Sequence, residues 1–389
     1  MRKVLQISDW YYPKFGGTEQ VARDVSNALN HYDDVEHKVI CFNEDAEDGG
    51  YVNHRNETVR ELVDGVEIIR CGVFTKIFSQ ALSVGYLGEL KRVLDDFDPD
   101  VVILHYPNPF VTALLMLFSR RKFKLAVYWH LDITKQKILK HLFHGQNKAL
   151  IRRSTFILGA TPNHVNMSAY TKYFGDKRYV LPYAIDERRL AISDEEKLKA
   201  GDIRKRYEGK VLGFFIGRHV PYKGLRYLIE ASAKLKDDKM HFLIAGSGPL
   251  TSELKALAAN DQKVEFVGRI TDSEWRSYLY ACDIFCFPSV TRNEGFGLAQ
   301  AEAMYYEKPV VTFTIKGSGV NLVNLNGVTG LECPNCDSAA YAEALTKLAD
   351  NPGLRKQMGA AGRKHVLENY TEAQFVKNVG KLLEDLMKN

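Results

Sequence analysis

Residues 284–304 read Ile-Phe-Cys-Phe-Pro-Ser-Val-Thr-Arg-Asn-Glu-Gly-Phe-Gly-Leu-Ala-Gln-Ala-Glu-Ala-Met, and they predict a strand, a loop and a helix in that order. The apolar run that ends at Phe287 is typical of a strand covered on both faces. Gly295 and Gly297 interrupt the loop, and an alanine-rich helix starts near Gly297. Such units build parallel sheets, whose ligands bind beyond the carboxyl ends of the strands.

The same alternation of short apolar runs and amphipathic helical patterns extends along the whole chain. In the first half, strands are predicted at residues 4–7, 37–42, 66–70, 101–104, 125–129, 156–160 and 179–181. In the second half, they are predicted at 211–216, 241–245, 264–267, 284–287, 310–313 and 331–333. Two such blocks predict an α/β fold with two doubly wound, Rossmann-like domains.

The boundary between the two predicted domains follows the strand at 179–181, where a proline and a charge-rich stretch begin. A chain of 389 residues has room for two or three domains at roughly 150 residues each. We therefore expect domains at 1–185 and 186–370, and a separate final segment at 371–389. That segment has apolar residues at helical spacing after Thr371, which predicts a terminal helix.

Composition and charge narrow the class of protein. The chain is 45% hydrophobic and 26% charged, which is typical of a soluble globular protein. Its net charge of +5 is too small to indicate nucleic-acid binding. The apolar stretch near the amino terminus is too short for a signal peptide, and the longest apolar run is too short to span a membrane. We expect a cytoplasmic protein.

The six cysteines include one Cys-x-x-Cys pair, Cys333 and Cys336. A structural zinc site needs a second such pair, and Cys282 and Cys286 have the wrong spacing within a predicted strand. We expect reduced, incidental cysteines and no bound metal.

Residues 120–153 hold ten basic side chains and a single acidic one, Asp132. A helical face in the same stretch carries four apolar residues, Ile138, Leu139, Leu142 and Phe143. This pattern fits the surface of an anionic membrane that presents a lipid-linked acceptor, with the protein peripheral on its inner face. It fits a solvated basic helix equally well.

Two glutamates follow the strand at 284–287 with E-x7-E spacing, Glu294 in the loop and Glu302 in the helix. The backbone N–H groups of Phe296, Gly297 and Leu298 are predicted donors at the helix amino terminus. Glu302 lies in an otherwise apolar helix, which is unusual for a surface acid. An acidic side chain near a bound nucleotide typically accepts hydrogen bonds from the ribose hydroxyls. The alternative is a capping acid and an ordinary surface acid.

The loop after the strand at 211–216 carries two cations, Arg218 and Lys223, just before a predicted helix. Arg can bind two phosphate oxygens at once, and Lys supplies a compact charge. Tyr222 stands where a P-loop requires glycine, so this motif is not a P-loop. The alternative is a solvated basic loop.

Three further motifs lie at predicted strand ends. Gly16 and Gly17 precede a helix and would let backbone amides approach an anion, unless they form a plain turn. His130 ends the strand at 125–129 and could bind a sugar hydroxyl, although a histidine there is commonly structural. The stretch from Gly246 resembles the start of a dinucleotide fingerprint, but Thr251 replaces its third glycine, which disfavours a dehydrogenase.

Taken in order, these motifs resemble the retaining glycosyltransferases of family 4, which have the GT-B fold of two Rossmann-like domains facing each other across a cleft. The resemblance covers nearly the whole chain. It implies that Arg218 and Lys223 bind the donor diphosphate with the amides of Gly16 and Gly17, and that Glu302 binds ribose. It also implies that Arg269 and Ile270 meet the base and that His130 faces the donor sugar. Glu294 and the backbone of the next four residues would hold the sugar and distal phosphate: Gly295, Phe296, Gly297 and Leu298.

Residues 129–137 and 288–294 look especially similar to bacterial mannosyl- and rhamnosyltransferases of O-antigen, capsule and exopolysaccharide synthesis. The resemblance implies a metal-independent hexosyltransferase without a cofactor. GDP-mannose is the favoured donor, UDP-hexose and dTDP-rhamnose are alternatives, and a glycan or polyprenyl-diphosphate-linked sugar is the acceptor. Two other classes stay open, namely a sugar-nucleotide epimerase of the same fold and a non-catalytic nucleotide-sugar-binding subunit.

Overall fold

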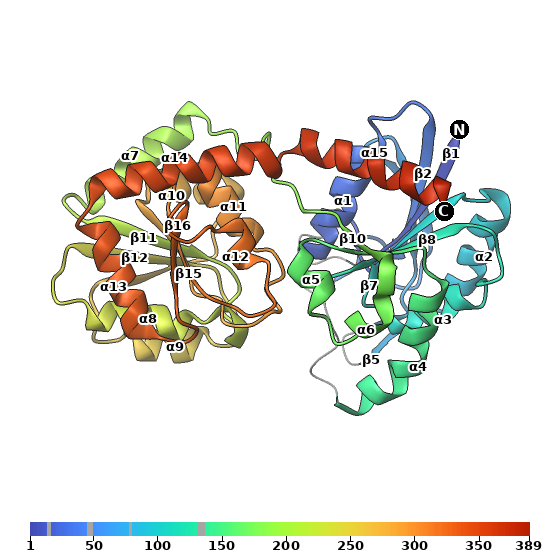
Figure 1. Ribbon diagram of the computed structural model, residues 1–389, viewed down its shortest axis with the longest axis horizontal. Coiled ribbons are helices and arrows are strands. Elements are labelled where there is room, and N and C mark those ends of the chain that lie inside the picture. The colour runs from blue at the N-terminus through green and yellow to red at the C-terminus, as the bar shows by residue number, and fades with distance from the viewer. Residues whose placement is uncertain (14–16, 45–49, 78–79, 131–136) are drawn as a thin grey trace. The chain divides into compact units, whose positions relative to one another are not determined.

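The computed structural model describes residues 1–13, 17–44, 50–77, 80–130 and 137–389, with the side chains of 17 and 137–142 left out (Figure 1). Within these ranges the chain folds into two compact units. The first unit comprises residues 1–183 and 372–389, and the second comprises 184–371. The boundaries that we predicted from the sequence lie within two residues of these.

The first unit is built on an eight-stranded sheet in the order β10-β9-β8-β7-β1-β2-β4-β3. Every neighbouring pair is parallel except β3 and β4. The strands are β1 (Arg2–Ile7), β2 (Val35–Phe42), β3 (Val59–Val63), β4 (Val66–Cys71), β7 (Val101–Tyr106), β8 (Lys124–Trp129), β9 (Phe156–Gly159) and β10 (Arg178–Val180). All seven strands predicted in this half are confirmed.

Three strands of the first unit were not predicted. Strand β3 is a half-exposed edge strand, and its hairpin to β4 turns at Asp64-Gly65, where both residues have positive φ. An Asp-Gly pair between two strands is a strong hairpin pattern, so this turn could have been found from the sequence. The other two strands, β5 (Thr75–Ile77) and β6 (Gln80–Leu82), form a separate antiparallel pair.

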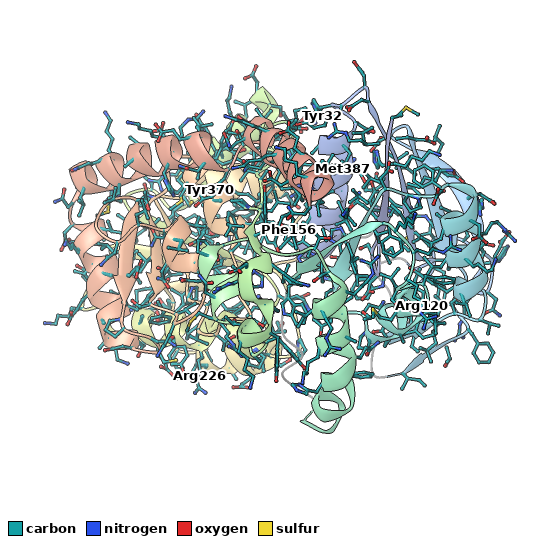
Figure 2. All side chains as sticks on the ribbon, turned by 45° about the vertical axis from the view of Figure 1, so that its right-hand side comes forward. Tyr32, Arg120, Phe156, Arg226, Tyr370 and Met387 are labelled. Carbon is teal, nitrogen blue, oxygen red and sulfur yellow. The ribbon has the colours of Figure 1, made fainter. Side chains whose placement is uncertain are left out.

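Helices cover the sheet of the first unit. They are α1 (Gly17–Leu29), α2 (Tyr86–Asp96), α3 (Pro109–Met116), α4 (Lys137–Arg153), α5 (Pro162–Asn166), α6 (Thr171–Phe174) and the terminal α15 (Glu372–Lys388). The Tyr32 hydroxyl, just after α1, donates to the Val376 carbonyl of α15 at 2.8 Å. Figure 2 labels Tyr32 and Met387 at this junction. The terminal helix therefore packs on the amino-terminal half of the chain.

The second unit is built on a six-stranded, fully parallel sheet in the order β13-β12-β11-β14-β15-β16. Its strands are β11 (Val211–Ile216), β12 (Met240–Ala245), β13 (Val264–Gly268), β14 (Ile284–Phe287), β15 (Val310–Phe313) and β16 (Gly330–Cys333). All six predicted strands are confirmed. The apolar runs of five strands are mostly buried because helices flank the sheet, whereas the edge strand β13 is partly exposed (Figure 1).

The helices of the second unit are α7 (Asp194–Arg206), α8 (Leu225–Lys234), α9 (Thr251–Leu257), α10 (Asp272–Ala281), α11 (Leu298–Tyr305), α12 (Val320–Val323), α13 (Ser338–Ala349) and α14 (Pro352–Asn369). The chain winds outward from β11 through β12 to β13, and then returns to place β14 beside β11. In the first unit, the same reversal lies between β1 and β7. Such switch points are where open α/β sheets bind ligands.

Candidate functional site

Two of the predicted site residues meet at the switch point of the second unit. Lys223 follows β11, Glu294 follows β14, and the Lys223 ammonium contacts the Glu294 carboxylate. Both side chains are only 13% exposed, and the Ser289 hydroxyl donates to the same carboxylate at 3.2 Å. Burial lowers the pKa of Lys223, but the charges of Glu294 and Tyr222 and the hydrogen bond to Glu294 together outweigh this effect, and the pKa is raised. Lys223 and Glu294 therefore form a largely buried ion pair beyond the carboxyl ends of β11 and β14.

A glycine allows the two loops to come this close. Gly224, the residue before α8, has φ +62°, and a Cβ there would lie 2.1 Å from the Pro288 carbonyl oxygen. The Val290 N–H also donates to the Tyr222 carbonyl at 2.9 Å. Because glycine alone fits such a close approach at positive φ, Gly224 holds Lys223 beside the loop that carries Glu294.

The loop from Glu294 to Gly297 is held by the segment after β15. The Ser318 hydroxyl donates to the Glu294 carbonyl, and the Gly319 N–H donates to the Gly295 carbonyl at 2.9 Å. Gly297 has φ +81° and precedes α11. Within the described ranges, no residue accepts a hydrogen bond from the N–H groups of Gly297 and Leu298. These two amides are donors for an anion at this strand end.

The side chain of Phe296 is buried within the second unit. Its ring is 2% exposed and packs edge-on against Tyr370 at 5.1 Å between ring centroids. The buried Gln300 amide donates to the Phe296 carbonyl at 2.9 Å. The Phe296 side chain thus anchors the loop, and its predicted contribution to a ligand is confined to the backbone.

Glu302, the second acid of the E-x7-E motif, has partners that the motif itself does not indicate. The Arg189 guanidinium lies 3.6 Å from its carboxylate and also makes two 3.1 Å hydrogen bonds to Asp272. Burial raises the pKa of Glu302 to about 6, which Arg189 opposes and the nearby carboxylates of Asp272 and Asp186 reinforce. Glu302 is therefore a buried acid whose charge depends on Arg189.

The other two predicted cations of the second unit are exposed. Arg218 has no ion-pair partner among the residues that the structure describes. The Arg269 guanidinium donates to the Ser247 hydroxyl at 2.9 Å, and Ile270 beside it is half-buried. Both arginines follow parallel strands of one sheet, so the structure places them on the same sheet edge as Lys223.

The glycines that suggested a broken dinucleotide fingerprint have a packing role. A Cβ at Gly246 would lie 2.1 Å from the Gly217 carbonyl oxygen, and one at Gly248 would lie 2.5 Å from the His219 carbonyl oxygen. The Thr251 hydroxyl lies 2.9 Å from both the His219 ring and the Gly248 N–H. These residues therefore join the loops that follow β11 and β12.

In the first unit, His130 follows β8 and is 7% exposed. Its Nε2 lies 3.0 Å from Nδ1 of His105, and its Nδ1 lies 2.8 Å from the Tyr183 hydroxyl. Gly16 lies outside the described residues, and Gly17 begins α1. Gln6 and His105 could have been noticed as polar residues near the ends of apolar strands, because buried polar groups need partners.

The predicted basic surface at 120–153 is divided between structural and exposed residues. The Arg153 guanidinium donates to three backbone carbonyls, those of Ser119, Arg121 and Phe123. Arg120, Lys122 and Arg152 are exposed. Three of the four apolar residues, Ile138, Leu139 and Leu142, lie outside the described side chains. Only part of this stretch is therefore available to a partner.

Two other expectations concern cysteines and membranes. Cys333 is buried, and its thiol donates to the Ala340 carbonyl at 3.5 Å, whereas Cys336 is exposed.

Among the described helices, none combines the length and the apolar character that a membrane crossing needs.

Comparisons with known proteins agree with this architecture. The family model "Glycosyltransferase Family 4" matches residues 15–187, and "Glycosyl transferases group 1" matches residues 198–365. The O-antigen chain mannosyltransferase C of Escherichia coli is 27% identical over 100% of this chain and 99% of its own length. The D-rhamnosyltransferase WbpZ of Pseudomonas aeruginosa is 27% identical over 88% of this chain and 85% of its own length.

Solved structures show the same fold. Sucrose-phosphate synthase from Thermosynechococcus elongatus superposes with a TM-score of 0.78 at 17% identity, over the whole of both chains. WaaG, a glycosyltransferase involved in lipopolysaccharide biosynthesis, gives 0.68 at 16% identity over 97% of this chain and 99% of its own. The fold and the two family models together define an enzyme of the glycosyltransferase class with GT-B architecture. Each half of the chain thus matches a glycosyltransferase family model, family 4 in the first half and group 1 in the second.

Proposed function

We propose that this enzyme transfers a hexose, mannose in the first instance, from a nucleotide-diphosphate sugar to a glycan or polyprenyl-diphosphate-linked acceptor in surface polysaccharide synthesis. The mannosyltransferase and rhamnosyltransferase relatives support this choice. GDP-mannose is the favoured donor, and UDP-hexose and dTDP-rhamnose are the alternatives.

The observation that carries the proposal is the contact between Lys223 and Glu294 at the switch point of the second unit. Negative charge grows on the phosphate oxygen as a nucleotide diphosphate leaves an anomeric carbon. Lys223, the exposed Arg218 and the amides of Gly297 and Leu298 supply positive potential at this strand end. Glu294 would exchange its contact with Lys223 for the hydroxyls of the donor sugar.

The nucleoside would occupy the neighbouring strand ends. Glu302 is suited to accept the ribose hydroxyls, because it is a buried carboxylate at the same sheet edge. The backbone at Arg269 and Ile270 would meet the base. His130 of the first unit would face the donor sugar.

For the chemistry, we propose retention of configuration by attack on the same face from which the phosphate leaves. The bond between the anomeric carbon and the phosphate oxygen breaks, and the acceptor oxygen bonds to that carbon. The proton of the acceptor hydroxyl passes to the leaving phosphate. Cationic side chains stabilise the negative charge on the leaving phosphate, without a metal ion. Trapping a glycosyl adduct on Glu294 would contradict this route, because a double displacement needs a carboxylate nucleophile.

A thermal-shift panel tests the donor site. GDP, UDP and dTDP are each added to the wild type, to Lys223→Ala and to the control Lys347→Ala, which removes an exposed lysine of α13. A ligand at about 100 times its Kd stabilises the native state by about 2.7 kcal/mol. We expect GDP to raise the Tm of the wild type and the control, and this shift to collapse in Lys223→Ala. No shift with any of the three would contradict a nucleotide-diphosphate donor.

Turnover separates the three candidate classes. A transferase converts GDP-mannose to GDP and a mannosylated product when a polyprenyl-diphosphate-linked sugar is present. An epimerase changes the donor without an acceptor, and a binding subunit leaves the donor intact. Mass spectrometry of the products distinguishes these outcomes.

A further inference from the structure

A continuous chain of hydrogen bonds, buried except at its Tyr183 end, crosses the switch point of the first unit. At one end of the chain, the side-chain amide of Gln6 in β1 donates to the hydroxyl of Ser26 in α1 at 2.7 Å. The Gln6 carbonyl lies 3.0 Å from Nε2 of His105 in β7. Nδ1 of His105 lies 3.0 Å from Nε2 of His130, and Nδ1 of His130 lies 2.8 Å from the Tyr183 hydroxyl.

The chain is enclosed and its rings are ordered by stacking. Gln6 and Ser26 are fully buried, and His105 is 4% exposed. The rings of His105 and His130 are stacked, with centroids 5.2 Å apart and planes 9° apart. The ring of Tyr128 stacks on His130 at 4.6 Å. Neither imidazole can therefore turn without disturbing the core of the sheet.

Both imidazoles are neutral in this setting. Burial lowers the pKa of His105 to about 3. Burial also lowers the pKa of His130 well below its ordinary value, and His105 and His164 add to the effect. A neutral imidazole donates from one nitrogen and accepts at the other, and the hydrogen bond of one nitrogen sets the role of the second.

The direction of the chain follows from Gln6. Its amide nitrogen is used by Ser26, so its carbonyl accepts the Nε2–H of His105. Nδ1 of His105 then accepts, which requires His130 to donate from Nε2. Nδ1 of His130 is left as an acceptor, and it receives the Tyr183 hydroxyl.

We propose that Gln6 and His105 are positioning residues that hold His130 as its Nε2–H tautomer, so that its Nδ1 accepts a hydroxyl of the donor sugar in place of Tyr183. The inference rests on the proposed function, because it makes His130 the residue that faces the sugar. Tyr183 is the last residue of the first unit before the chain enters the second, so its hydroxyl lies at the start of the linker.

Nitrogen-15 NMR of histidine-labelled full-length protein measures the tautomer directly. The resonances of His130 are assigned by their loss in His130→Gln. We expect an Nε2 shift of the protonated type and an Nδ1 shift of the unprotonated type in the wild type, with no change between pH 6 and 8. The opposite tautomer, or a charged ring, would overturn the proposal.

Substitution of His105 tests its positioning role. His105→Leu removes the acceptor for His130, whereas His105→Gln can still accept from His130 and donate to Gln6. We expect the tautomer of His130 to become mixed in His105→Leu and to stay as in the wild type in His105→Gln. The matched control is His37→Leu, which removes another buried histidine of the same sheet whose Nε2 has no hydrogen-bond partner among the described residues.

Transfer of mannose from GDP-mannose to a polyprenyl-diphosphate-linked sugar provides the kinetic readout. Loss of a residue that orients a functional histidine typically costs 10–100-fold. We expect a fall of about 10- to 100-fold in kcat/KM for His105→Leu, recovery in His105→Gln, and less than about 2-fold change in His37→Leu at equal folded fraction. Equal losses in all three variants, with an unchanged tautomer, would assign His105 a merely structural role.

The two proposals fail in distinguishable ways. If the wild type has the expected tautomer but neither transfers mannose nor binds any of the three nucleotides, the proposed function is wrong. If it transfers mannose but His130 is the opposite tautomer, only the role of Gln6 and His105 is wrong.

Discussion

The two switch points of this enzyme are built from opposite kinds of polar group. In the second unit, Lys223 and Glu294 face each other as full charges. In the first unit, Gln6, His105 and His130 form a neutral chain in which every proton has an assigned place. A diphosphate is recognised best by charge, whereas a sugar hydroxyl is recognised by a directional donor or acceptor. The charged pair of the second unit therefore suits a diphosphate, and the neutral chain of the first unit suits a sugar hydroxyl.

Loss of Lys223 should have the largest effect. Removing one group that stabilises developing charge typically costs 10²–10³ in rate. We expect Lys223→Met to lower kcat/KM by about that factor and to destabilise the fold, since it leaves Glu294 half-buried without its cation. Initial rates and urea unfolding measure the two effects. In Lys223→Met/Glu294→Gln, stability should recover while activity stays low, and recovery of both would contradict a role in catalysis.

Gly224→Ala tests the close approach of the two loops that carry the charged pair. A side chain at positive φ costs about 1–2 kcal/mol, and here a Cβ would also lie 2.1 Å from the Pro288 carbonyl oxygen. Gly209→Ala is the matched control, because Gly209 has φ +77° and nothing within 4 Å of its Cβ position.

We expect Gly209→Ala to lose about 1 kcal/mol of unfolding free energy with normal nucleotide binding. Gly224→Ala should lose more and should also weaken GDP binding. Equal effects of the two substitutions, measured by urea unfolding and calorimetry, would show that the loop contact is unimportant.

Arg189→Gln tests the charge of Glu302. The pKa of Glu302 is raised to about 6, so this carboxyl is ionised above that pH and neutral below it. Because a neutral acid accepts ribose hydroxyls less well, nucleotide affinity in the wild type should fall as the pH drops through about 6. Removing the positive charge of Arg189 should raise the pKa of Glu302 further, and the midpoint should move to higher pH.

If the pKa rises by about one unit, the ionised fraction of Glu302 falls about 2-fold at pH 7 and about 10-fold well below pH 6, and we expect GDP affinity to fall by the same factors. The other ionisable groups near Glu302 are Asp186, Asp272 and Tyr306. Only the two aspartates could also gain a proton as the pH falls. Arg206→Gln, which removes an exposed arginine paired with Glu265, serves as the control and should leave the profile unchanged. A pH-independent affinity in the wild type would exclude Glu302 from the ribose site.

The last prediction concerns the surface of the first unit. Arg120→Glu/Lys122→Glu reverses two exposed charges, and each basic residue near an anionic membrane contributes about 1 kcal/mol. We expect sedimentation with vesicles containing phosphatidylserine to weaken by about 5-fold for each reversed charge. Lys236→Glu/Lys347→Glu makes the same change on the second unit and should have no effect. No sedimentation of the wild type, or equal loss in both variants, would contradict a membrane-binding site on residues 120–153.

Much of the second unit could be predicted from the sequence because its functional residues lie within a few positions of predicted strand ends. Arg218 and Lys223 follow one strand, Glu294 follows another, and parallel strands bring such loops to a common edge. The roles predicted for Arg218, Lys223, Glu294, Glu302 and His130 remain predictions that the experiments above address.

The polar chain of the first unit could not be predicted in the same way. Gln6, His105 and His130 are far apart in the sequence and belong to three adjacent strands or their ends. Arg189 likewise reaches Glu302 from more than a hundred residues away. Neither set has a fixed spacing that a motif could record.

The sequence by itself determined the thirteen strands, the two-unit α/β organisation and the family, because these depend on local periodicity and on short motifs. Only the tertiary structure decided which polar side chains meet and which protons they share. Hydrogen bonds act over about 3 Å, and the register of neighbouring strands sets such distances between residues that the chain separates widely. The tautomer of His130 is therefore a property of the folded sheet, not of any segment of the sequence.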